Sequence, residues 1–353
     1  RILIVPFGTG IGDLVLQRGP FAGVAHRWPA AEVSVYAPST AAALLPTGVH
    51  HCSTIFGIPA WHRVAGVERA LALLGPWEWR AIDAIFRAIP LRAISGVPSR
   101  TLEPHYDLVV NLLRAFVSAI DFQHDWLPGR EGDVQHVLDS LAEFLATIDV
   151  ALPPSRRVLS LSIPPQDDAD AGRLLATLAA TRPRVLLNPH AGSPLKLPNN
   201  DFWIDLAAAL DKQGITPLVV AGNGPKDRER TRKITAKAGL ALPAIPLPLV
   251  VAVGRRCQLT ISPDTALLHL IALDGQRWIG LFGSTNPYLT GPYNRSRGRL
   301  MIARPPRGPA CLSCWQRFSI GSTCCPVFEA GSCLSTIDVH AVAAAAIEQM
   351  RGV

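Results

Sequence analysis

The chain has 353 residues, 48% hydrophobic and 17% charged, so it is long enough for two domains with ordinary cores and too apolar to be disordered. Its formal net charge of +7 suits an acidic partner such as a nucleotide diphosphate, a phosphorylated glycan or an anionic membrane face, or simply a soluble basic surface. Nucleic acid is disfavoured, because the sequence has no tight Lys/Arg run, helix-turn-helix signature or RNA-binding aromatic motif.

The first part of the sequence alternates strands with helices. Apolar strands are predicted at residues 2–5, 32–36 and 107–112, and a glycine-rich turn at residues 8–12 leads from the first strand into a helix. This β-α-β order favours a parallel sheet.

The second part repeats the alternation after a composition change at residues 161–169, which is interpreted as a hinge. Asn200 is predicted to cap one helix, and Ser335 with Asp338 forms a capping-box pattern before the last one. The predicted helices are 171–180, 201–212, one from Thr265 onward, and 336–350; the predicted strands are 184–187, 218–221, 259–262 and 278–282.

These elements predict an α/β protein with two Rossmann-like domains that face each other across a cleft, the GT-B arrangement. The expected limits are 1–165 for the first domain and 166–335 for the second, which includes the Cys-rich segment 311–333. The remaining residues, 336–353, form a C-terminal helix for which a crossing back to the first domain is considered.

The first candidate motif is GTGIGD at residues 8–13, between a strand and a helix. Glycines there let backbone amides approach a ligand and direct a helix dipole at an anion. The motif is not the G-x-G-x-x-G dinucleotide fingerprint, and no acidic residue ends the second strand at Tyr36, which argues against a dehydrogenase. Asp13 either deprotonates an acceptor hydroxyl or caps the helix.

The second motif, LNPHAGSPLK at residues 187–196, follows another predicted strand. Loop amides around Gly192 and Ser193, with the Lys196 ammonium, suit a diphosphate at the carboxyl end of a parallel strand. His190 is either part of that site or an ordinary loop histidine.

The third motif, SPDTALLH at residues 262–269, lies at a further strand-to-helix junction. Thr265 offers a hydroxyl and a backbone amide to a phosphate, and Asp264 either accepts from a sugar or ribose hydroxyl or caps the helix. His269 lies one turn further along the same helix face. The following strand ends in another small polar loop at residues 282–287.

Taken together, the Gly-Asp turn, the Pro-His-Ala-Gly loop with its Lys and the Asp-Thr-Ala-x-x-His motif resemble glycosyltransferase family 9, the lipopolysaccharide heptosyltransferases. The order and spacing cover nearly the whole chain. The resemblance implies that Asp13 is the general base and that Lys196 binds the donor diphosphate. The donor-binding residues it implies are Gly12, His190, Gly192, Ser193, Lys196, Gly222, Asn223, Asp264, Thr265, Ala266 and His269.

The sequence departs from the family pattern at two places. Ala266 stands where the family has glycine, which restricts backbone approach to a phosphate. The loop at residues 222–225, GNGP, lacks an immediate acidic residue where family members often have Glu. Both departures leave the donor base and sugar open.

Five cysteines crowd into residues 311–333, which indicates a cytoplasmic protein, since a secreted disulfide protein would normally scatter them. Four such thiolates could hold a structural zinc or iron ion, and the alternative is reduced thiols or a disulfide. The candidate ligands are Cys311, Cys314, Cys324, Cys325 and Cys333.

The resemblance implies transfer of a heptose or related sugar from a nucleotide diphosphate sugar, ADP-heptose first, with inversion and with no cofactor required. The acceptor is left open among a glycan, a lipid-linked molecule and a protein. Peripheral contact with the inner membrane and a homo-oligomer are considered. No apolar run reaches the length of a membrane span. The alternatives are a GT-B nucleotide-sugar epimerase and a binding protein without turnover.

Overall fold

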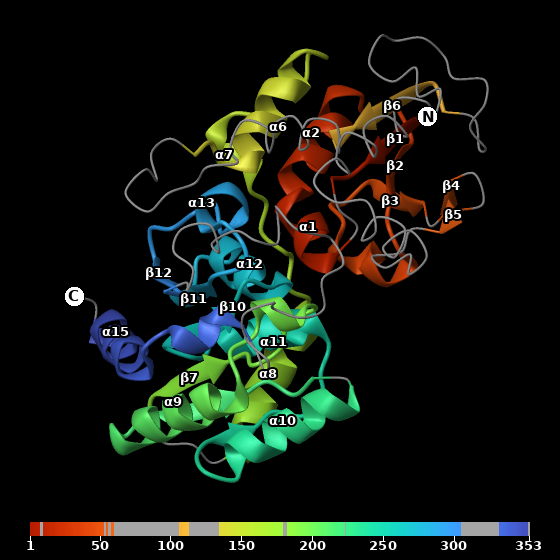
Figure 1. Cartoon of the computed structure of the whole chain (residues 1–353). Helices are drawn as coiled ribbons and strands as arrows, with labels where there is room; N and C mark the ends of the chain where they lie inside the picture. The colour runs from red at the N-terminus through yellow and green to blue at the C-terminus, as the bar shows by residue number, and fades with distance from the viewer. Residues whose placement is uncertain are drawn as a thin grey trace. The chain divides into compact units, whose positions relative to one another are not determined.

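The computed structural model describes residues 1–7, 10–52, 54–55, 58–59, 106–112, 134–178, 182–222, 224–304 and 332–351. The chain divides into two compact units, and the division falls between Leu159 and Ser160. The first unit also takes in Tyr288–Tyr293 from the second half of the sequence. Figure 1 shows the elements of both units.

The first unit contains a parallel four-stranded sheet of order β3-β2-β1-β6. Its strands are β1 (Ile2–Val5), β2 (Val33–Tyr36), β3 (Val49–Cys52) and β6 (Leu108–Asn111). The described helices between Arg1 and Leu159 are α1 (Ile11–Leu16), α2 (Arg18–Arg27), α6 (Val137–Ala146) and α7 (Pro154–Arg157). The 3₁₀ helix η1 (Ser39–Leu44) lies between β2 and β3. A two-residue pair, β4 (Thr54–Ile55) with β5 (Ile58–Pro59), is antiparallel.

The core of the first unit lies between one face of the sheet and the helices α2 and α6. Ile4 on β1 and Val35 on β2 alternate with residues of the opposite face, and they pack with Phe21 of α2 and Leu141 of α6. These four side chains are fully buried. Successive side chains of a strand point to opposite faces, so this alternation sets the register of the whole layer.

The second unit contains a parallel six-stranded sheet of order β12-β11-β10-β7-β8-β9. Its central strands are buried along their whole length, as expected when helices cover both faces. The strands are β7 (Arg184–Leu187), β8 (Thr216–Val219), β9 (Leu240–Ala241), β10 (Leu259–Pro263), β11 (Trp278–Phe282) and β12 (Gly298–Ile302).

Helices cover both faces of this second sheet (Figure 1). On one face α9 and α15 pack with side chains such as Leu187 and Ile261, and on the other face α11 packs against α8 and α12. The helices are α8 (Pro165–Thr177), α9 (Asn200–Lys212), α10 (Pro225–Thr235), α11 (Leu247–Gly254), α12 (Ala266–Leu273) and α15 (Val339–Arg351), with short 3₁₀ turns η4 (Pro194–Lys196) and η6 (Cys333–Thr336). Two Rossmann-like α/β units are thus confirmed.

Two predicted helix starts were wrong, and the segment expected as a hinge is partly helical. The expected hinge at 161–169 contains the start of α8, where Pro165 occupies the first turn and Asp167 and Asp168 carry negative charge near the positive end of the helix dipole. Asn199, and not Asn200, caps α9 by accepting a hydrogen bond from the Phe202 amide at 2.9 Å. At the last helix, Asp338 accepts from the His340 amide at 2.8 Å, so the helix begins after it.

The C-terminal helix α15 belongs to the second unit. α15 packs against α9 in the second unit, and Val342 and Ala346 are fully buried in that core. The segment that joins the first unit is Tyr288–Tyr293, which includes most of α13 (Pro287–Thr290) and follows β11.

Side chains of the first unit hold this segment. The His136 ring nitrogen Nε2 lies 2.9 Å from the Gly291 carbonyl oxygen. The Tyr293 hydroxyl donates to Asp139 Oδ1 at 2.7 Å and accepts from Arg157 Nη1 at 2.9 Å, while Arg157 also pairs with Asp139. Leu289 is buried in the core of the first unit.

Candidate active site

The carboxyl edge of the second sheet gathers the motifs of the second half. β7, β8, β10 and β11 are parallel, so the loops that follow them leave from the same edge. In open α/β sheets, ligands bind in the crevice outside the carboxyl ends of the strands. The loop residues there come from positions 188–196, 220–224, 264–265 and 283–286.

Asn188 joins two of these loops. Its side-chain amide donates to Ser262 Oγ at 2.9 Å and to Thr265 Oγ1 at 3.1 Å, and its Oδ1 accepts from the His190 amide at 3.3 Å. Asn188 is buried, so these bonds are shielded from water. The side chain therefore fixes the end of β7 against the start of α12, and it orients the Thr265 hydroxyl.

A buried ion cluster lies beside that connection. Lys196 Nζ donates to Asp264 Oδ2 at 2.8 Å, and His269 Nε2 lies 3.3 Å from the other oxygen, Oδ1. The side chains of Asp264 and His269 are only 7% and 6% exposed, whereas Lys196 is 22% exposed. The ammonium is therefore the member of the cluster that is most exposed to solvent.

The Asp264 carboxyl remains ionised in this setting. Burial alone would raise its pKa, but the Lys196 ammonium and the hydrogen bond from His269 outweigh burial and hold the pKa well below the ordinary aspartate range. The structure thus brings Lys196 together with Asp264 and His269, which lie in a motif about 70 residues further along the sequence.

Thr265 is the N-terminal cap residue of α12, and its side chain makes no capping bond to that helix. Its hydroxyl instead accepts from Asn188 and shares a 3.1 Å hydrogen bond with Ser262. The helix therefore begins at Ala266, and its N-terminal amides lie at the carboxyl edge of the sheet. The N-terminus of a helix favours the binding of an anion.

His190 connects the loop after β7 to β8 and α10. Its Nε2 donates to the Val220 carbonyl at 2.8 Å and lies 3.2 Å from Thr231 Oγ1, while Nδ1 lies 3.4 Å from Asp227 Oδ1. Burial lowers the pKa of the His190 imidazole, although the Val220 carbonyl and Asp227 oppose that shift. These contacts indicate a histidine that holds the loop in place.

Asp227 is the site residue that the sequence reading missed. It lies in the first turn of α10, and a Cβ on Gly222 would come within 2.3 Å of the Asp227 Cβ. A Cβ on Gly224 would lie 3.3 Å from Asp227 Oδ2. The glycine loop therefore wraps around a carboxylate that is 42% exposed. The sequence did contain a signal for this helix start, because a proline followed by an acidic residue, here Pro225 and Asp227, is typical of the first turn of a helix.

The loop after β11 completes this edge. Its residues Ser284, Thr285 and Asn286 are buried. A Cβ on Gly283 would lie 2.7 Å from Cys333 Sγ, so this position has no room for a side chain. Gly192 lies in the loop after β7, and Ser193 caps η4 by accepting from the Leu195 amide at 3.2 Å.

In the first unit, Asp13 lies in the first turn of α1 at the carboxyl end of β1. Gln17, which is fully buried, ties this turn together: its Oε1 accepts from the Phe7 amide at 3.0 Å and its Nε2 donates to the Asp13 carbonyl at 3.0 Å. Gly10 is the cap residue, and a Cβ there would lie 2.8 Å from Asp13 Oδ2. Gly12 and Asp13 are partly exposed.

Several predicted residues lie outside the described ranges: Gly8, Asn223, and the cysteines Cys311, Cys314, Cys324 and Cys325. Cys333 is described, and its thiol is buried beside Leu334 in the core of the second unit. Within the described ranges no group of three or more His, Cys, Asp or Glu side chains could hold a metal ion. In that same part of the chain, no helix is long and apolar enough to span a membrane.

Comparison with known proteins gives this edge a context. The glycosyltransferase family 9 (heptosyltransferase) model matches residues 125–309. Lipopolysaccharide heptosyltransferase 1 of Escherichia coli K12 is 25% identical over 269 residues, which cover 71% of this chain and 81% of that protein.

Solved structures share the fold. The glycosyl transferase family 9 protein of Veillonella parvula DSM 2008 matches with a TM-score of 0.63 at 15% identity. The match covers 100% of this chain and 98% of the Veillonella chain. A second match is the dodecameric iron-containing heptosyltransferase TibC of enterotoxigenic E. coli, solved in complex with ADP-D-beta-D-heptose. Its TM-score is 0.52 at 14% identity, and the match covers 99% of this chain and 76% of the TibC chain. The chain belongs to glycosyltransferase family 9 and is a glycosyltransferase with the GT-B fold class.

Proposed function

We propose that this chain transfers a heptose or a closely related sugar from a nucleotide diphosphate sugar to an acceptor hydroxyl with inversion, and that ADP-heptose is the donor. The observation that carries the proposal is the Lys196–Asp264–His269 cluster beside Thr265, because it places one solvent-reaching cation next to a helix N-terminus. The E. coli relative is named a lipopolysaccharide heptosyltransferase, and TibC was solved with ADP-D-beta-D-heptose.

The leaving group sets the chemistry that the donor edge must supply. As the bond from the anomeric carbon to the diphosphate breaks, negative charge grows on the diphosphate oxygens. The Lys196 ammonium, the Thr265 hydroxyl and the first amides of α12 stabilise that charge most when it is largest, which lowers the barrier. Asp264 holds Lys196 in place and accepts hydrogen bonds from sugar hydroxyls.

The nucleotide is assigned to the loop around Gly222. Asp227 supplies the carboxylate that the loop itself lacks, and a carboxylate at this place suits the two hydroxyls of a ribose. His190 holds the neighbouring loop through Val220, so Gly192 and Ser193 are presented to the diphosphate from a fixed backbone.

Asp13 is the proposed general base. It removes the proton from the acceptor hydroxyl while the oxygen attacks the anomeric carbon from the side opposite the diphosphate, which inverts the configuration there. Gln17 positions the helix turn that carries Asp13. The acceptor proposed first is a lipopolysaccharide core sugar, as the name of the E. coli relative suggests, and a cytoplasmic protein at the inner-membrane face fits such an acceptor.

A structural metal at the cysteine segment 311–333 belongs to the same proposal. The support is the spacing of the cysteines and the iron that TibC is named for. Elemental analysis of protein purified without added metal is the test: about one equivalent of zinc or iron is expected, and well under half an equivalent with all thiols open to labelling would contradict it. TibC is also dodecameric, so we expect a homo-oligomer, which light scattering measures.

A donor screen by mass spectrometry tests the function. The purified chain is incubated with ADP-heptose, ADP-glucose, GDP-mannose and UDP-glucose, each with and without a truncated lipopolysaccharide core. The expected result is a sugar transferred to the acceptor when ADP-heptose is the donor, and no transfer from the other three donors. A donor epimerised at one carbon would establish an epimerase instead, and calorimetric binding without product would establish a binding protein.

A further inference from the structure

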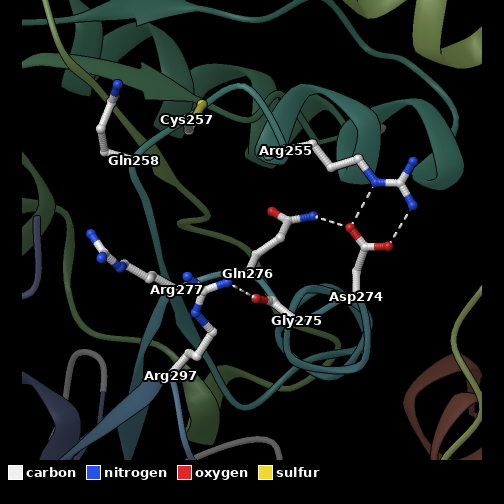
Figure 2. A pocket seen from close by; sticks show the side chains of 9 residues that line it. Arg255, Cys257, Gln258, Asp274, Gly275, Gln276, Arg277 and Arg297 are labelled. Atoms are coloured by element: carbon white, nitrogen blue, oxygen red, sulfur yellow. Dashed lines mark hydrogen bonds and ion pairs between the residues drawn. The ribbon is translucent and has the colours of Figure 1, made fainter. Parts of the chain in front are cut away.

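A second cavity lies at the opposite edge of the same sheet (Figure 2). Its volume is about 540 Å³. It is formed where β10, β11 and β12 begin, whereas the proposed donor site lies where β10 and β11 end. The residues that line it are Gly254, Arg255, Cys257, Gln258, Asp274, Gly275, Gln276, Arg277 and Arg297.

The cavity is basic. Its lining has three arginines and one aspartate, a formal charge of +3 − 1 = +2. The aspartate is already engaged: Asp274 accepts from Arg255 at 2.8 and 2.5 Å and from Gln276 Nε2 at 2.7 Å. Its charge therefore neutralises Arg255, and the excess positive charge rests on Arg277 and Arg297.

Arg277 and Arg297 stand just before two adjacent parallel strands, β11 and β12. They immediately precede Trp278 and Gly298, which pair in the β11–β12 register, and the Trp278 amide donates to the Arg297 carbonyl at 3.1 Å. Each side chain donates from Nη1 to one backbone oxygen: Arg277 to Met350 at 3.2 Å and Arg297 to Gly275 at 2.9 Å.

Four other arginines of the second unit differ in one respect. Within the described part of the chain, neither Arg277 nor Arg297 has a carboxylate within ion-pair distance. By contrast, these four arginines each have one, namely Arg182 with Asp211, Arg255 with Asp274, Arg256 with Asp168 and Arg299 with Glu348. The positive charges of Arg277 and Arg297 therefore have no neutralising carboxylate among the described residues, and both side chains line the same cavity.

We propose that this cavity binds a phosphoryl group, as inorganic phosphate or on a larger phosphorylated molecule, between Arg277 and Arg297. A guanidinium has five N–H donors in a planar fork that matches phosphate oxygens, and each of these two side chains commits Nη1 to a backbone oxygen. The Gln258 side chain adds a polar group to the same wall. The site goes beyond the sugar transfer, because it lies at the other end of the strands.

A purely structural role for the two arginines makes a different prediction. Arginine side chains near helix C-termini stabilise the carbonyl ends, and Met350 and Gly275 lie at or just after such ends. If that were their whole role, their replacement would lower the melting temperature and leave phosphate binding unchanged. Ligand affinity and stability therefore have to be measured on the same variants.

The test is calorimetric titration of inorganic phosphate into the full chain, with Arg277→Gln/Arg297→Gln and the charge-preserving Arg277→Lys/Arg297→Lys. Arg299→Gln is the matched control, because Arg299 is an exposed arginine of β12 that already pairs with Glu348. The glutamine pair should lose phosphate affinity by about tenfold or more, the scale of a lost charge-assisted hydrogen bond. The lysine pair should lose less, and Arg299→Gln should stay within about twofold.

A site-resolved measurement separates this cavity from the donor edge. Phosphate should protect Arg277 and Arg297 from phenylglyoxal, read peptide by peptide in a mass spectrometer, while Arg299 stays reactive. Vesicles of phosphatidylcholine with and without phosphatidic acid distinguish the source: arginine-dependent sedimentation, competed by free phosphate, assigns the phosphoryl group to a lipid headgroup. If neither phosphate affinity, protection nor sedimentation depends on the two arginines, the site does not exist, whatever the donor screen gives.

Discussion

The side-chain amide of Asn188 donates to the hydroxyl of Thr265 at 3.1 Å, across 77 residues of sequence. The same amide reaches Ser262 at 2.9 Å, so one buried residue joins the ends of β7 and β10. Neither partner was assigned such a role from the sequence. The bond makes the geometry of the Asp-Thr-Ala motif depend on the loop that carries Lys196.

Asn188→Ala should weaken both stability and nucleotide binding. Removal of the amide leaves buried hydroxyls without their donor, which should cost about 2 kcal/mol of unfolding free energy. Because Thr265 then loses its orientation, ADP affinity should fall by about tenfold. Urea unfolding and calorimetry measure the two effects.

The matched control for this variant is Asn199→Ala. Asn199 caps α9 in the same unit, so its loss should cost about 1 kcal/mol and leave ADP affinity unchanged. Equal losses of ADP affinity in both variants would mean that Asn188 acts only through general stability.

Asp264→Asn should change how stability depends on pH. The folded pKa of Asp264 lies below the unfolded value of about 3.9, so the unfolded chain binds the extra proton first. The carboxylate therefore contributes stability that is fully present at neutral pH and is lost as the pH falls below about 4. The variant should lose roughly 3 kcal/mol at pH 7, because Lys196 is left without its anion.

Urea unfolding between pH 3 and 7 follows this effect by circular dichroism. Asp264→Asn should show a shallower loss of stability in acid than the native chain. Asp211→Asn, which removes an exposed pair with Arg182, is the control and should behave like the native chain at every pH. An unchanged acid slope in Asp264→Asn would show that the buried cluster does not titrate as described.

Asp13→Asn should remove turnover and spare donor binding. The amide cannot take the acceptor proton, so turnover should fall by about 10² or more, while ADP affinity stays near the native value. Asp149→Asn is a control with the same change of charge, at an exposed position with φ 58° that asparagine tolerates. Turnover close to native in Asp13→Asn would show that another group is the base.

Gln17→Met tests whether the turn positions Asp13. Methionine fills a similar volume but neither accepts from Phe7 nor donates to the Asp13 carbonyl, so it leaves a buried amide unpaired at a cost of about 1–3 kcal/mol. The turnover number of the folded enzyme should fall while the KM for the donor stays constant, because the donor edge lies in the other unit. A lower melting temperature with a native turnover number would assign Gln17 a structural role alone.

Several strands of both sheets were accessible from the sequence because they are continuous apolar runs. The strands at 2–5, 184–187 and 278–282 match the structure residue for residue. α10 and β12 were missed: the helix is strongly charged, with only Thr231 and Ile234 buried, and β12 is an edge strand without buried residues. Periodicity gives little signal in such elements.

The site was predictable in its motifs and not in its contacts. The sequence placed Lys196, Asp264 and His269 near one sheet edge, since parallel strands end together. It did not indicate that Asp264 would lie between the other two, nor that Asp227 would face Gly222. Those contacts depend on rotamers and loop paths, which only tertiary packing sets. The roles of these residues stay predictions until the variants are measured.

The segment Tyr288–Tyr293 bears on how this chain can be cut into pieces. It lies between β11 and β12 of the second unit but is held by Asp139 and Arg157 of the first. A gene split after Leu159 would therefore give an N-terminal fragment without Leu289 in its core, and a C-terminal fragment with that side chain exposed. Expression of the halves needs a permuted design in which residues 288–293 are supplied to the first fragment and replaced by a short linker in the second.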